Sequence, residues 1–334
     1  MIIPVKTELS TYNIFLERGA LTRAGEYLNL NRRVLIVTDS GVPTQYAETV
    51  ANQCMAPVQV TIPQGEASKN IDSLKQILEV LCRSGFTRAD CVVAVGGGVV
   101  GDLAGFAASC YMRGIDFYNI PTTLLSQTDS SIGGKTAIDF LGYKNIVGAF
   151  YQPKAVLIDS NTLSTLPCRQ ISNGLSEVIK MALTHNAELF KILEDEDIYA
   201  NIDYIIEQAL YIKRAVVEED EHESGLRMVL NFGHTLAHAI EAANDMEELY
   251  HGECVAIGML PMCSDTVRAR LIPVLERFNL PTKTRGDRER LFEAMGHDKK
   301  LANKDITVVY VPEVGSFKFE KLTLDTLFER MKDI

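Results

Sequence analysis

The sequence predicts an α/β protein of two domains, with a Rossmann-like, mostly parallel sheet in residues 1–160 and mainly α-helical structure in residues 161–334. Up to about residue 160, short β-branched runs alternate with helical patterns, as in the β-α units that build parallel sheets. After Leu166 and Pro167, apolar residues recur with a period of about 3.6, which is typical of helices. A length of 334 residues is enough for two domains of ordinary size.

The expected elements follow from these patterns in chain order. Five short runs rich in β-branched residues predict buried strands, at residues 33–38, 58–62, 91–95, 117–120 and 155–158. Apolar residues at helical spacing predict a helix over residues 70–84. The same spacing in the second domain predicts helices at residues 177–184, 202–217, 228–243 and 253–266, and residues 306–311 predict a strand or one arm of a hairpin.

The composition limits the classes of partner. Acidic residues exceed basic residues by 44 to 33, and the net charge of −11 disfavours a broad surface for nucleic acid or an anionic membrane. The seven cysteines include no CxxC pair and the amino terminus shows no export signal, so we expect reduced thiols and a cytoplasmic protein. The apolar stretch 91–110 contains five glycines and Asp102, so we do not expect it to cross a membrane.

A glycine-rich turn between a strand and a helix is the first candidate site. Gly96, Gly97 and Gly98 follow the strand predicted at 91–95 and open a helical pattern. Backbone N–H groups at such a helix start bind phosphate, and a side chain there would block the approach of the anion. The pattern GGGVVGD differs from the usual GxGxxG fingerprint, so the motif is also compatible with a tight strand-to-helix turn that binds nothing.

Two further positions favour a dinucleotide. Asp39 follows the strand predicted at 33–38, and Thr122 and Thr123 follow the strand predicted at 117–120. Ligands of open α/β sheets bind at the carboxyl ends of the strands, and an acidic residue at the ribose favours NAD over NADP. The alternative for Asp39 is a helix N-cap or a turn residue. We therefore expect the first domain to bind NAD.

A cluster of histidines predicts a metal site in the second domain. Asn231, His234 and His238 stand at i, i+3 and i+7, so on a helix they project from one face, and His251 follows a short acidic stretch. Glu177 lies on another predicted helix, so two imidazoles and one carboxylate can meet. Three protein ligands with an open position are typical of catalytic Zn²⁺. The spacing leaves open whether His238 binds the metal or transfers protons.

Five basic residues lie in or beside apolar or glycine-rich stretches, where an unpaired cation is costly to bury. They are Lys135, Lys144, Lys180, Lys213 and Arg227. In an acidic chain, cations in such places are expected to surround an anionic ligand. The alternative for each residue taken singly is a surface salt bridge.

Several long motifs, in order along the chain, resemble the 3-dehydroquinate synthase family. They are GGGVVGDLAGFAASCYMRGI from Gly96, IPTTLLSQTDSSIGGKTAID from Ile120, KNIVGAFYQP from Lys144, GLSEVIK from Gly174, GLRMVLNFGHTLAHAIE from Gly225, HGECVAIGM from His251 and DKK at 298–300. The resemblance extends from Gln64 to about Lys300.

This resemblance implies a lyase that depends on NAD and one divalent metal ion, zinc or cobalt, and that is commonly a homodimer. It implies conversion of 3-deoxy-D-arabino-heptulosonate 7-phosphate, a small anionic phosphorylated sugar acid, to 3-dehydroquinate and phosphate. The alternatives are another sugar-phosphate cyclase and a non-catalytic NAD-binding protein on the same scaffold.

The resemblance also implies roles for individual residues, carried over position by position. The metal ligands would be Glu177, His234 and His251. The residues that contact NAD would be Glu66, Lys69, Gly97, Gly98, Asp102, Thr122, Thr123, Lys144, Thr162 and Thr165. The substrate pocket and proton transfer would use Asp129, Lys135, Asn145, Lys180, Lys213, Glu223, Arg227, Asn231, His238 and one of Lys299 and Lys300. Arg113 would reach the phosphate pocket of a neighbouring subunit.

Overall fold

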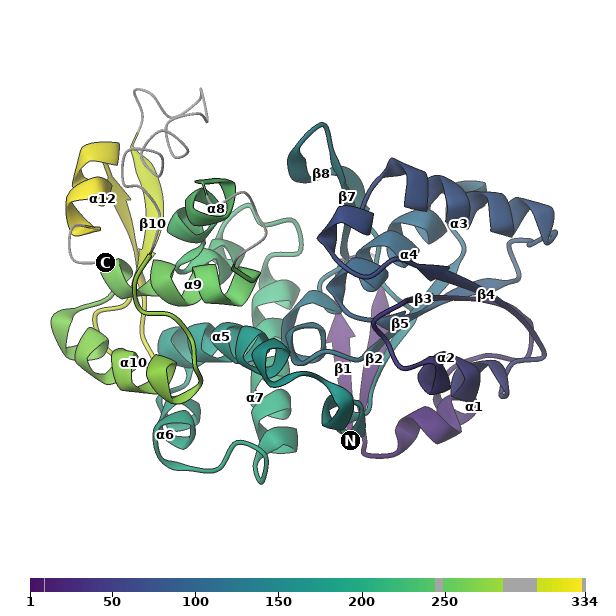
Figure 1. The fold of residues 1–334 in the computed structure, drawn as a ribbon, viewed down its shortest axis with the longest axis horizontal. Coiled ribbons are helices and arrows are strands. Elements are labelled where there is room, and N and C mark those ends of the chain that lie inside the picture. Colours follow the sequence, from purple (N-terminus) through teal and green to yellow (C-terminus); the bar gives the residue numbers. More distant parts are fainter. Residues whose placement is uncertain (9, 244–248, 285–304, 332–334) are drawn as a thin grey trace. The chain divides into compact units, whose positions relative to one another are not determined.

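The computed structural model describes residues 1–8, 10–243, 249–284 and 305–331 (Figure 1). The chain divides into two compact units. The first unit comprises Met1–Leu166 and Lys213–Glu221, and the second comprises Pro167–Ile212 and His222–Ile334. Helix α7 (Ile202–Glu219) therefore begins in the second unit and supplies its last turns to the first.

A seven-stranded sheet forms the centre of the first unit, with the strand order β1-β2-β9-β6-β5-β3-β4. Every neighbouring pair is parallel except β1 and β2, so the expected mostly parallel α/β domain is confirmed. All five predicted strands are present, and the β1–β2 hairpin, which the sequence analysis did not predict, completes the sheet. The strands are β1 (Ile2–Lys6), β2 (Thr11–Leu16), β3 (Arg33–Asp39), β4 (Ala56–Ile62), β5 (Cys91–Gly96), β6 (Asp116–Pro121) and β9 (Ala155–Ile158).

Helices cover both faces of this sheet (Figure 1). In β3, Leu35 and Val37 belong to the core formed with α3 (Ile71–Arg83) and α4 (Gly98–Cys110), while Val34 and Ile36 belong to the core formed with α1 (Ala24–Tyr27) and α2 (Thr44–Ala51). Because neighbouring side chains of a strand point to opposite faces, a strand covered on both sides is apolar throughout. This explains why the central strands are continuous apolar runs.

A separate hairpin, β7 (Lys135–Phe140) and β8 (Tyr143–Phe150), packs against α4 through the buried Ile138. Its turn places Leu141 and Gly142 at φ values of 51° and 82°. Both residues of a tight hairpin turn take positive φ because this twist matches that of the strands. Leu141 therefore adopts a conformation that is uncommon for a residue with a branched side chain.

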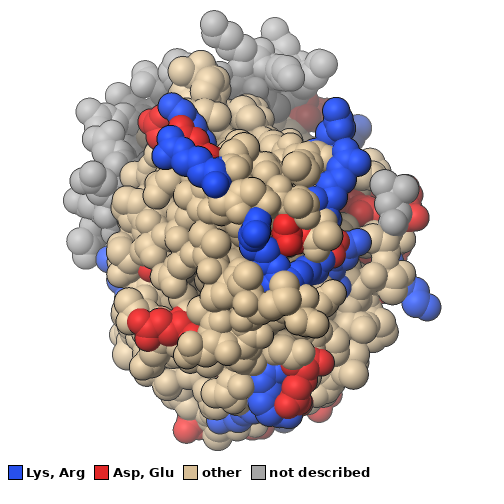
Figure 2. Space-filling model, turned by 90° about the vertical axis from the view of Figure 1, so that its right-hand side faces the viewer, with Lys and Arg blue, Asp and Glu red and all other residues tan. Residues whose placement is uncertain are grey.

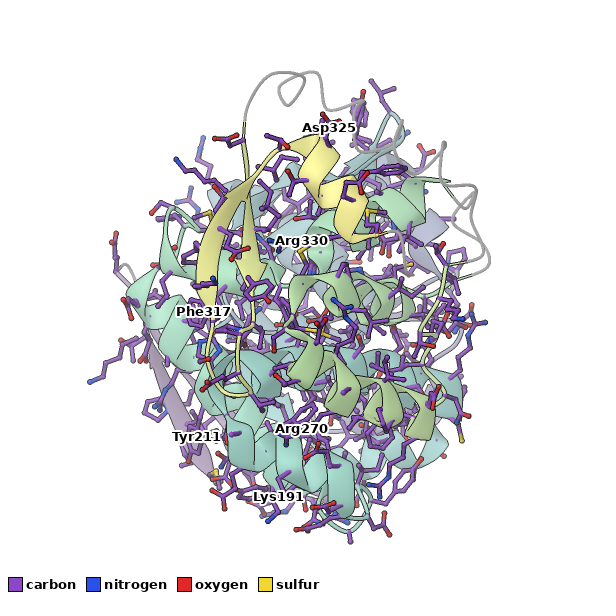
Figure 3. The ribbon with its side chains drawn as sticks, turned by 90° about the vertical axis from the view of Figure 1, so that its left-hand side faces the viewer. Lys191, Tyr211, Arg270, Phe317, Asp325 and Arg330 are labelled. Carbon is purple, nitrogen blue, oxygen red and sulfur yellow. The ribbon has the colours of Figure 1, made fainter. Side chains whose placement is uncertain are left out.

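The second unit is mainly helical, as expected. Its elements are α5 (Cys168–His185), α6 (Ala187–Asp195), most of α7, η6 (Leu226–Asn231), α8 (His234–Ala243), α9 (His251–Met259), η7 (Leu260–Met262), α10 (Asp265–Arg277), β10 (Ile306–Tyr310), β11 (Lys318–Leu322) and α12 (Leu324–Arg330). Figure 3 shows α12 beside the β10–β11 hairpin, where Arg330 lies 2.9 Å from Glu320 and covers the ring of Tyr310. Among the described residues, no helix has both the length and the apolar character needed to cross a membrane.

Two predicted helices are interrupted. The helix expected over 228–243 is a 3₁₀ turn, η6, followed by a break at Gly233, whose φ is 80°, and then α8. The helix expected over 253–266 ends at Met259, and a new helix begins after Ser264, whose side chain caps α10. The expectation that Asn231, His234 and His238 share one continuous helical face is therefore wrong for Asn231.

Candidate functional site

Glu177, His234 and His251 meet in the second unit. Their ligand atoms lie within 4.8 Å of one another. The Nε2 atoms of His234 and His251 are 3.5 Å and 3.3 Å from Oε1 of Glu177, whose side chain is fully buried. One carboxylate and two imidazole nitrogens are a ligand set that suits a divalent ion such as Zn²⁺ or Co²⁺.

Both imidazoles are oriented by a hydrogen bond at the other ring nitrogen. Nδ1 of His251 lies 2.8 Å from Oε1 of Glu241, and Nδ1 of His234 lies 3.2 Å from the carbonyl oxygen of Phe232. A metal-binding histidine usually donates its second N–H to a carboxylate or a backbone carbonyl, which leaves the first nitrogen free for the ion. The residues present therefore fit a metal centre.

Helix packing holds the three ligands together. Glu177 lies on α5, and Asn173, one turn earlier on the same helix, accepts a hydrogen bond of 2.6 Å from the backbone N–H of Gly252 in the first turn of α9. A Cβ atom at Gly252 would lie only 2.1 Å from the carbonyl oxygen of Asn173. The helix that carries His251 can approach the helix that carries Glu177 only because position 252 is glycine.

Further contacts fix the start of α9. The carboxylate of Glu253 accepts a hydrogen bond of 2.8 Å from the backbone N–H of Tyr250 and two of 2.7 Å from Arg169, whose guanidinium covers the Tyr250 ring. A carboxylate at this position satisfies a backbone donor that the helix itself leaves unpaired. These contacts set the direction in which His251 leaves the chain.

The environment sets the charges of the metal site. Burial alone would raise the pKa of Glu177, but Lys180 and the two imidazoles outweigh burial and hold that pKa well below its usual value. Burial and the nearby Lys180 lower the pKa of His234 to about 3, so this ring is neutral, as a ligand must be. Burial also opposes the charged form of His251, but hydrogen bonds to Glu177 and Glu241 raise its pKa to about 9.

The other residues predicted in this unit lie on neighbouring segments. His238 is exposed, with its ring centroid 5.7 Å from that of His234 and 6.4 Å from that of His251, and it lies outside the three-residue group. Asn231 donates a hydrogen bond of 2.8 Å to Glu223, so these two predicted residues do lie together. Lys180 contacts Glu177, and both Lys180 and Arg227 are buried. Lys299 lies outside the described residues.

The glycine turn of the first unit opens a helix, as the sequence predicts. Gly97 is the N-cap of α4 and Gly98 is its first residue. A Cβ atom at Gly97 would lie 3.1 Å from the side chain of Thr123, and one at Gly98 would lie 3.2 Å from that of Ser130. Thr122 donates its backbone N–H to the carbonyl oxygen of Gly96 over 2.9 Å. The loops that follow β5 and β6 therefore pack closely, and the glycines permit this approach.

A buried lysine, itself expected to contact NAD, pairs with two other residues of the expected NAD site. Nζ of Lys69 lies 2.7 Å from Glu66 and 3.3 Å from Asp102, and the lysine side chain is only 5% exposed. Burial raises the pKa of Asp102 to about 7, although the charge of Lys69 opposes this shift. Asp102 lies on α4, one turn after Gly98, so the cluster adjoins the glycine turn.

Asp39 holds the turn after its own strand, as one of its alternatives predicts, and its expected contact with the ribose of NAD stays a prediction. Its Oδ1 accepts hydrogen bonds of 2.8 Å and 3.1 Å from the backbone N–H groups of Gly41 and Val42.

The two threonines expected to contact NAD after β9 both have partners within the protein. Thr162 donates its hydroxyl to the carbonyl oxygen of Asp159 and accepts from Gln127, and Thr165 contacts the hydroxyl of Tyr46.

The remaining cations differ in exposure. Lys213, near the end of α7, is buried and pairs with Asp129, so two predicted pocket residues of the first unit are in contact. Lys135 is exposed and Lys144 is half-buried, both on the β7–β8 hairpin, where the backbone N–H of Asn145 donates to Asp139 over 2.8 Å.

Arg113 is exposed in the 3₁₀ turn η3 (Tyr111–Arg113), with φ of 67°. On the face seen in Figure 2, Lys and Arg side chains form small groups beside Asp and Glu.

Four of the predicted cations have buried side chains. They are Lys69, Lys180, Lys213 and Arg227.

Sequence comparison identifies the family. A family model of the 3-dehydroquinate synthase N-terminal domain matches residues 59–173, and a model of the C-terminal domain of the same enzyme matches residues 174–301. The chain belongs to the 3-dehydroquinate synthase family. The 3-dehydroquinate synthase of Streptococcus suis strain 05ZYH33 is 41% identical, with 98% of this chain and 99% of the relative covered. That of Streptococcus thermophilus strain CNRZ 1066 is 40% identical, with 99% and 100% covered.

Solved structures share the fold of this 3-dehydroquinate synthase family member. A 2-deoxy-scyllo-inosose synthase, complexed with carbaglucose-6-phosphate, NAD⁺ and Co²⁺, superposes with a TM-score of 0.91 at 24% identity, with 100% of both chains covered. The 2-epi-5-epi-valiolone synthase ValA of Streptomyces hygroscopicus subsp. jinggangensis 5008, with NAD⁺ and Zn²⁺ bound, gives a TM-score of 0.87 at 26% identity, with 98% of both chains covered. The expected fold class and family are confirmed.

Sequence reasoning missed residues that support the ligands. Glu241 lies two helical turns after His234 on α8, and this seven-residue spacing was the available signal. Asn173 stands one turn before Glu177, but nothing in its local sequence indicates a bond to the start of another helix.

Proposed function

We propose that this chain is a 3-dehydroquinate synthase that converts 3-deoxy-D-arabino-heptulosonate 7-phosphate to 3-dehydroquinate and phosphate. We further propose that it works as a cytoplasmic homodimer with NAD and one divalent metal ion, zinc or cobalt. The observation that carries the proposal is the convergence of Glu177, His234 and His251 in a chain whose relatives are synthases over nearly their whole length. The solved inosose and valiolone synthases, which contain NAD⁺ with Co²⁺ or Zn²⁺, support the choice of cofactors.

In this proposal, Glu177, His234 and His251 hold the metal ion through one carboxylate oxygen and two Nε2 atoms. When bound, the ion supplies Lewis-acid chemistry that lowers the pKa of substrate hydroxyl groups. The low pKa of Glu177 and the neutral ring of His234 prepare both groups to bind a cation without first losing a proton.

Basic residues of the second unit would bind the anionic parts of the substrate. Lys180 lies against Glu177 and is 2% exposed, and Arg227 in η6 is also 2% exposed. A buried cation is costly unless an anion compensates it, and fixed positive charge stabilises the negative charge that develops as phosphate leaves. The exposed His238 and the Asn231–Glu223 pair would bind substrate hydroxyls and move protons.

The first unit would bind NAD at the glycine turn. The free N–H groups at the start of α4 suit a pyrophosphate, and the glycines leave room for it. Glu66, Lys69 and Asp102 form a polar cluster near this turn, and Thr122 and Thr123 follow β6. Lys213 and Asp129, which pair in the first unit, and Lys135 and Asn145 of the β7–β8 hairpin would also bind substrate.

The direct test is to incubate the purified protein with the heptulosonate phosphate, trace NAD⁺ and Zn²⁺ or Co²⁺. We expect phosphate release with formation of dehydroquinate and no net NADH. Turnover of a different sugar phosphate in its place would make the chain another cyclase, accumulation of NADH would make it a dehydrogenase, and NAD binding without any turnover would make it a binding protein.

A substitution tests the metal ligands. His251→Ala removes one of three ligands, so we expect it to abolish both metal retention and activity, as measured by metal content after dialysis and by phosphate release. The matched control is His185→Ala. His185 lies two turns after Glu177 on the same helix and packs on Phe317, so this variant should keep its metal. A His251→Ala protein that kept metal and activity would show that the ligand assignment is wrong.

A further inference from the structure

We propose that Glu241 is a positioning residue of the metal centre, whose carboxylate holds the imidazole of His251 so that Nε2 faces the ion. This inference rests on the proposed function, because it assumes that Glu177, His234 and His251 bind a metal. It concerns a residue outside that ligand set.

The position of Glu241 follows from helix geometry. It lies on α8 seven residues after His234, which is close to two turns, so the two side chains share a face of the helix. Its side chain is buried, with 8% of its surface exposed, and Oε1 lies 2.8 Å from Nδ1 of His251. Helix α8 therefore carries the proposed ligand His234 and also Glu241, the hydrogen-bond partner of His251 on α9.

Glu241 and Glu177 contact different nitrogens of the His251 ring. Nδ1 faces Glu241, while Nε2 lies 3.3 Å from Oε1 of Glu177. These two ring nitrogens point in different directions, so the oxygen that accepts from Nδ1 is not placed to bind the ion that Nε2 would bind. In agreement, Glu241 is not part of the three-residue group whose ligand atoms lie within 4.8 Å of one another.

The chemistry of the contact suits orientation. When a metal ion displaces the Nε2 proton, acceptance of the remaining Nδ1 proton by Glu241 fixes the tautomer of His251 and directs the Nε2 lone pair to the ion. An anionic acceptor also makes the imidazole a stronger donor to the metal. His234 has only a neutral acceptor at Nδ1, the carbonyl oxygen of Phe232 at 3.2 Å. Nδ1 of His234 thus faces a neutral acceptor, whereas Nδ1 of His251 faces the charged carboxylate of Glu241.

Metal binding by the purified, metal-free protein tests this role without an activity assay. We would titrate the wild type, Glu241→Gln and Glu241→Ala with Co²⁺ and follow the visible absorption of the bound ion. We expect Glu241→Ala to weaken Co²⁺ binding about 10- to 100-fold, the range typical of lost outer-shell partners. Glu241→Gln keeps an acceptor but loses the charge, so its affinity should fall between those of the other two proteins.

Glu320→Gln is the matched control. Glu320 is a partly buried carboxylate of the same unit, paired with Lys318 and Arg330 on the β10–β11 hairpin and α12, and its partners include no proposed metal ligand. We expect this variant to bind Co²⁺ as the wild type does. Thermal unfolding of each metal-free variant checks that it is folded, and Glu241→Gln keeps the test valid if the alanine variant does not fold.

Two results would overturn the inference. Equal Co²⁺ affinity in the wild type and in the folded Glu241 variants would show that Glu241 does not position His251. A change in absorption intensity typical of a lost ligand in Glu241→Gln would show that Glu241 binds the ion directly. If the wild type itself binds no Co²⁺, the proposed function fails, which is a different outcome from the failure of Glu241 alone.

Discussion

Substitution of Gly252 by alanine should disrupt the metal site by moving a helix. The new Cβ atom would lie 2.1 Å from the carbonyl oxygen of Asn173 and 2.8 Å from its side-chain oxygen. Ordinary contact begins at 3.4 Å, so α9 must move away from α5 by about 3.4 − 2.1 = 1.3 Å. The obstacle is a backbone atom of a buried helix, which has little freedom to yield.

A displacement of this size is large for a metal site. Ligand distances in such sites are held to within about 0.2 Å, so a shift of His251 relative to Glu177 by several times that amount should remove most of the metal affinity. Overpacking of a core costs about 1–3 kcal/mol, and the movement of α9 would also stretch the hydrogen bond from Gly252 to Asn173. The higher helix propensity of alanine offsets at most about 1 kcal/mol of this loss of stability.

The assay is Co²⁺ titration of the metal-free protein together with its thermal unfolding. We expect Gly252→Ala to lose Co²⁺ affinity at least 100-fold and to unfold at a lower temperature. Gly25→Ala is the matched control, because a Cβ atom at this helical glycine of α1 would meet nothing closer than 3.9 Å. If Gly252→Ala bound Co²⁺ and unfolded as Gly25→Ala does, the argument from close approach would be refuted.

Two further predictions concern the first unit. Burial raises the pKa of Asp102 from 3.8 to about 7 against the opposing charge of Lys69, so the folded protein binds this proton more tightly than the unfolded chain does. The wild type should therefore lose stability as pH rises from about 4 to about 7, by up to about 4 kcal/mol from this group. Asp102→Asn should lose less stability over the same pH range. If the free energy of unfolding, measured with urea, changed equally with pH in both proteins, the assignment of this effect to Asp102 would be contradicted. Gln127→Ala should destabilise the protein by about 1–3 kcal/mol, since the buried amide donates to the carbonyl oxygen of Pro121 and to the hydroxyl of Thr162, which would lose this donor. The carbonyl oxygen of Asp159 also accepts from the amide but keeps the Thr162 hydroxyl as a donor. An unchanged free energy of unfolding would show that water replaces the amide.

Local sequence patterns predicted much of the fold. The strands at 33–38 and 91–95 contain continuous apolar runs because helices cover both faces of the sheet, and such runs are visible without any tertiary knowledge. The β1–β2 hairpin carried a signal too, since Ile3 and Val5 alternate with exposed residues, but this half-polar pattern is weaker than the apolar runs of the central strands. The helical spacing of apolar residues also continued across Gly233, so the sequence predicted one helix where the structure has a break. Spacing of apolar residues carries no information about φ, which is 80° at Gly233.

The candidate site was predicted in its residue types but not in its support. The pattern of histidines together with Glu177 indicated a metal centre, and the resemblance to the family favoured Glu177, His234 and His251 over His238 as its ligands. Neither indicated that Glu241 orients His251 or that Asn173 holds the first turn of α9. These contacts join segments far apart in the chain, so their partners are determined by how the helices pack.

The sequence by itself determined the fold class, the glycine turn and the family, because these depend on the order of residue types along the chain. Only the tertiary structure decided that Lys213–Glu221 belong to the first unit, that Asp39 binds the turn after its own strand, and that Asn231 leaves the face of His234. The physical reason is that each of these outcomes is set by close packing and by the pairing of buried polar groups. Both depend on distances between atoms that the order of residues leaves unspecified.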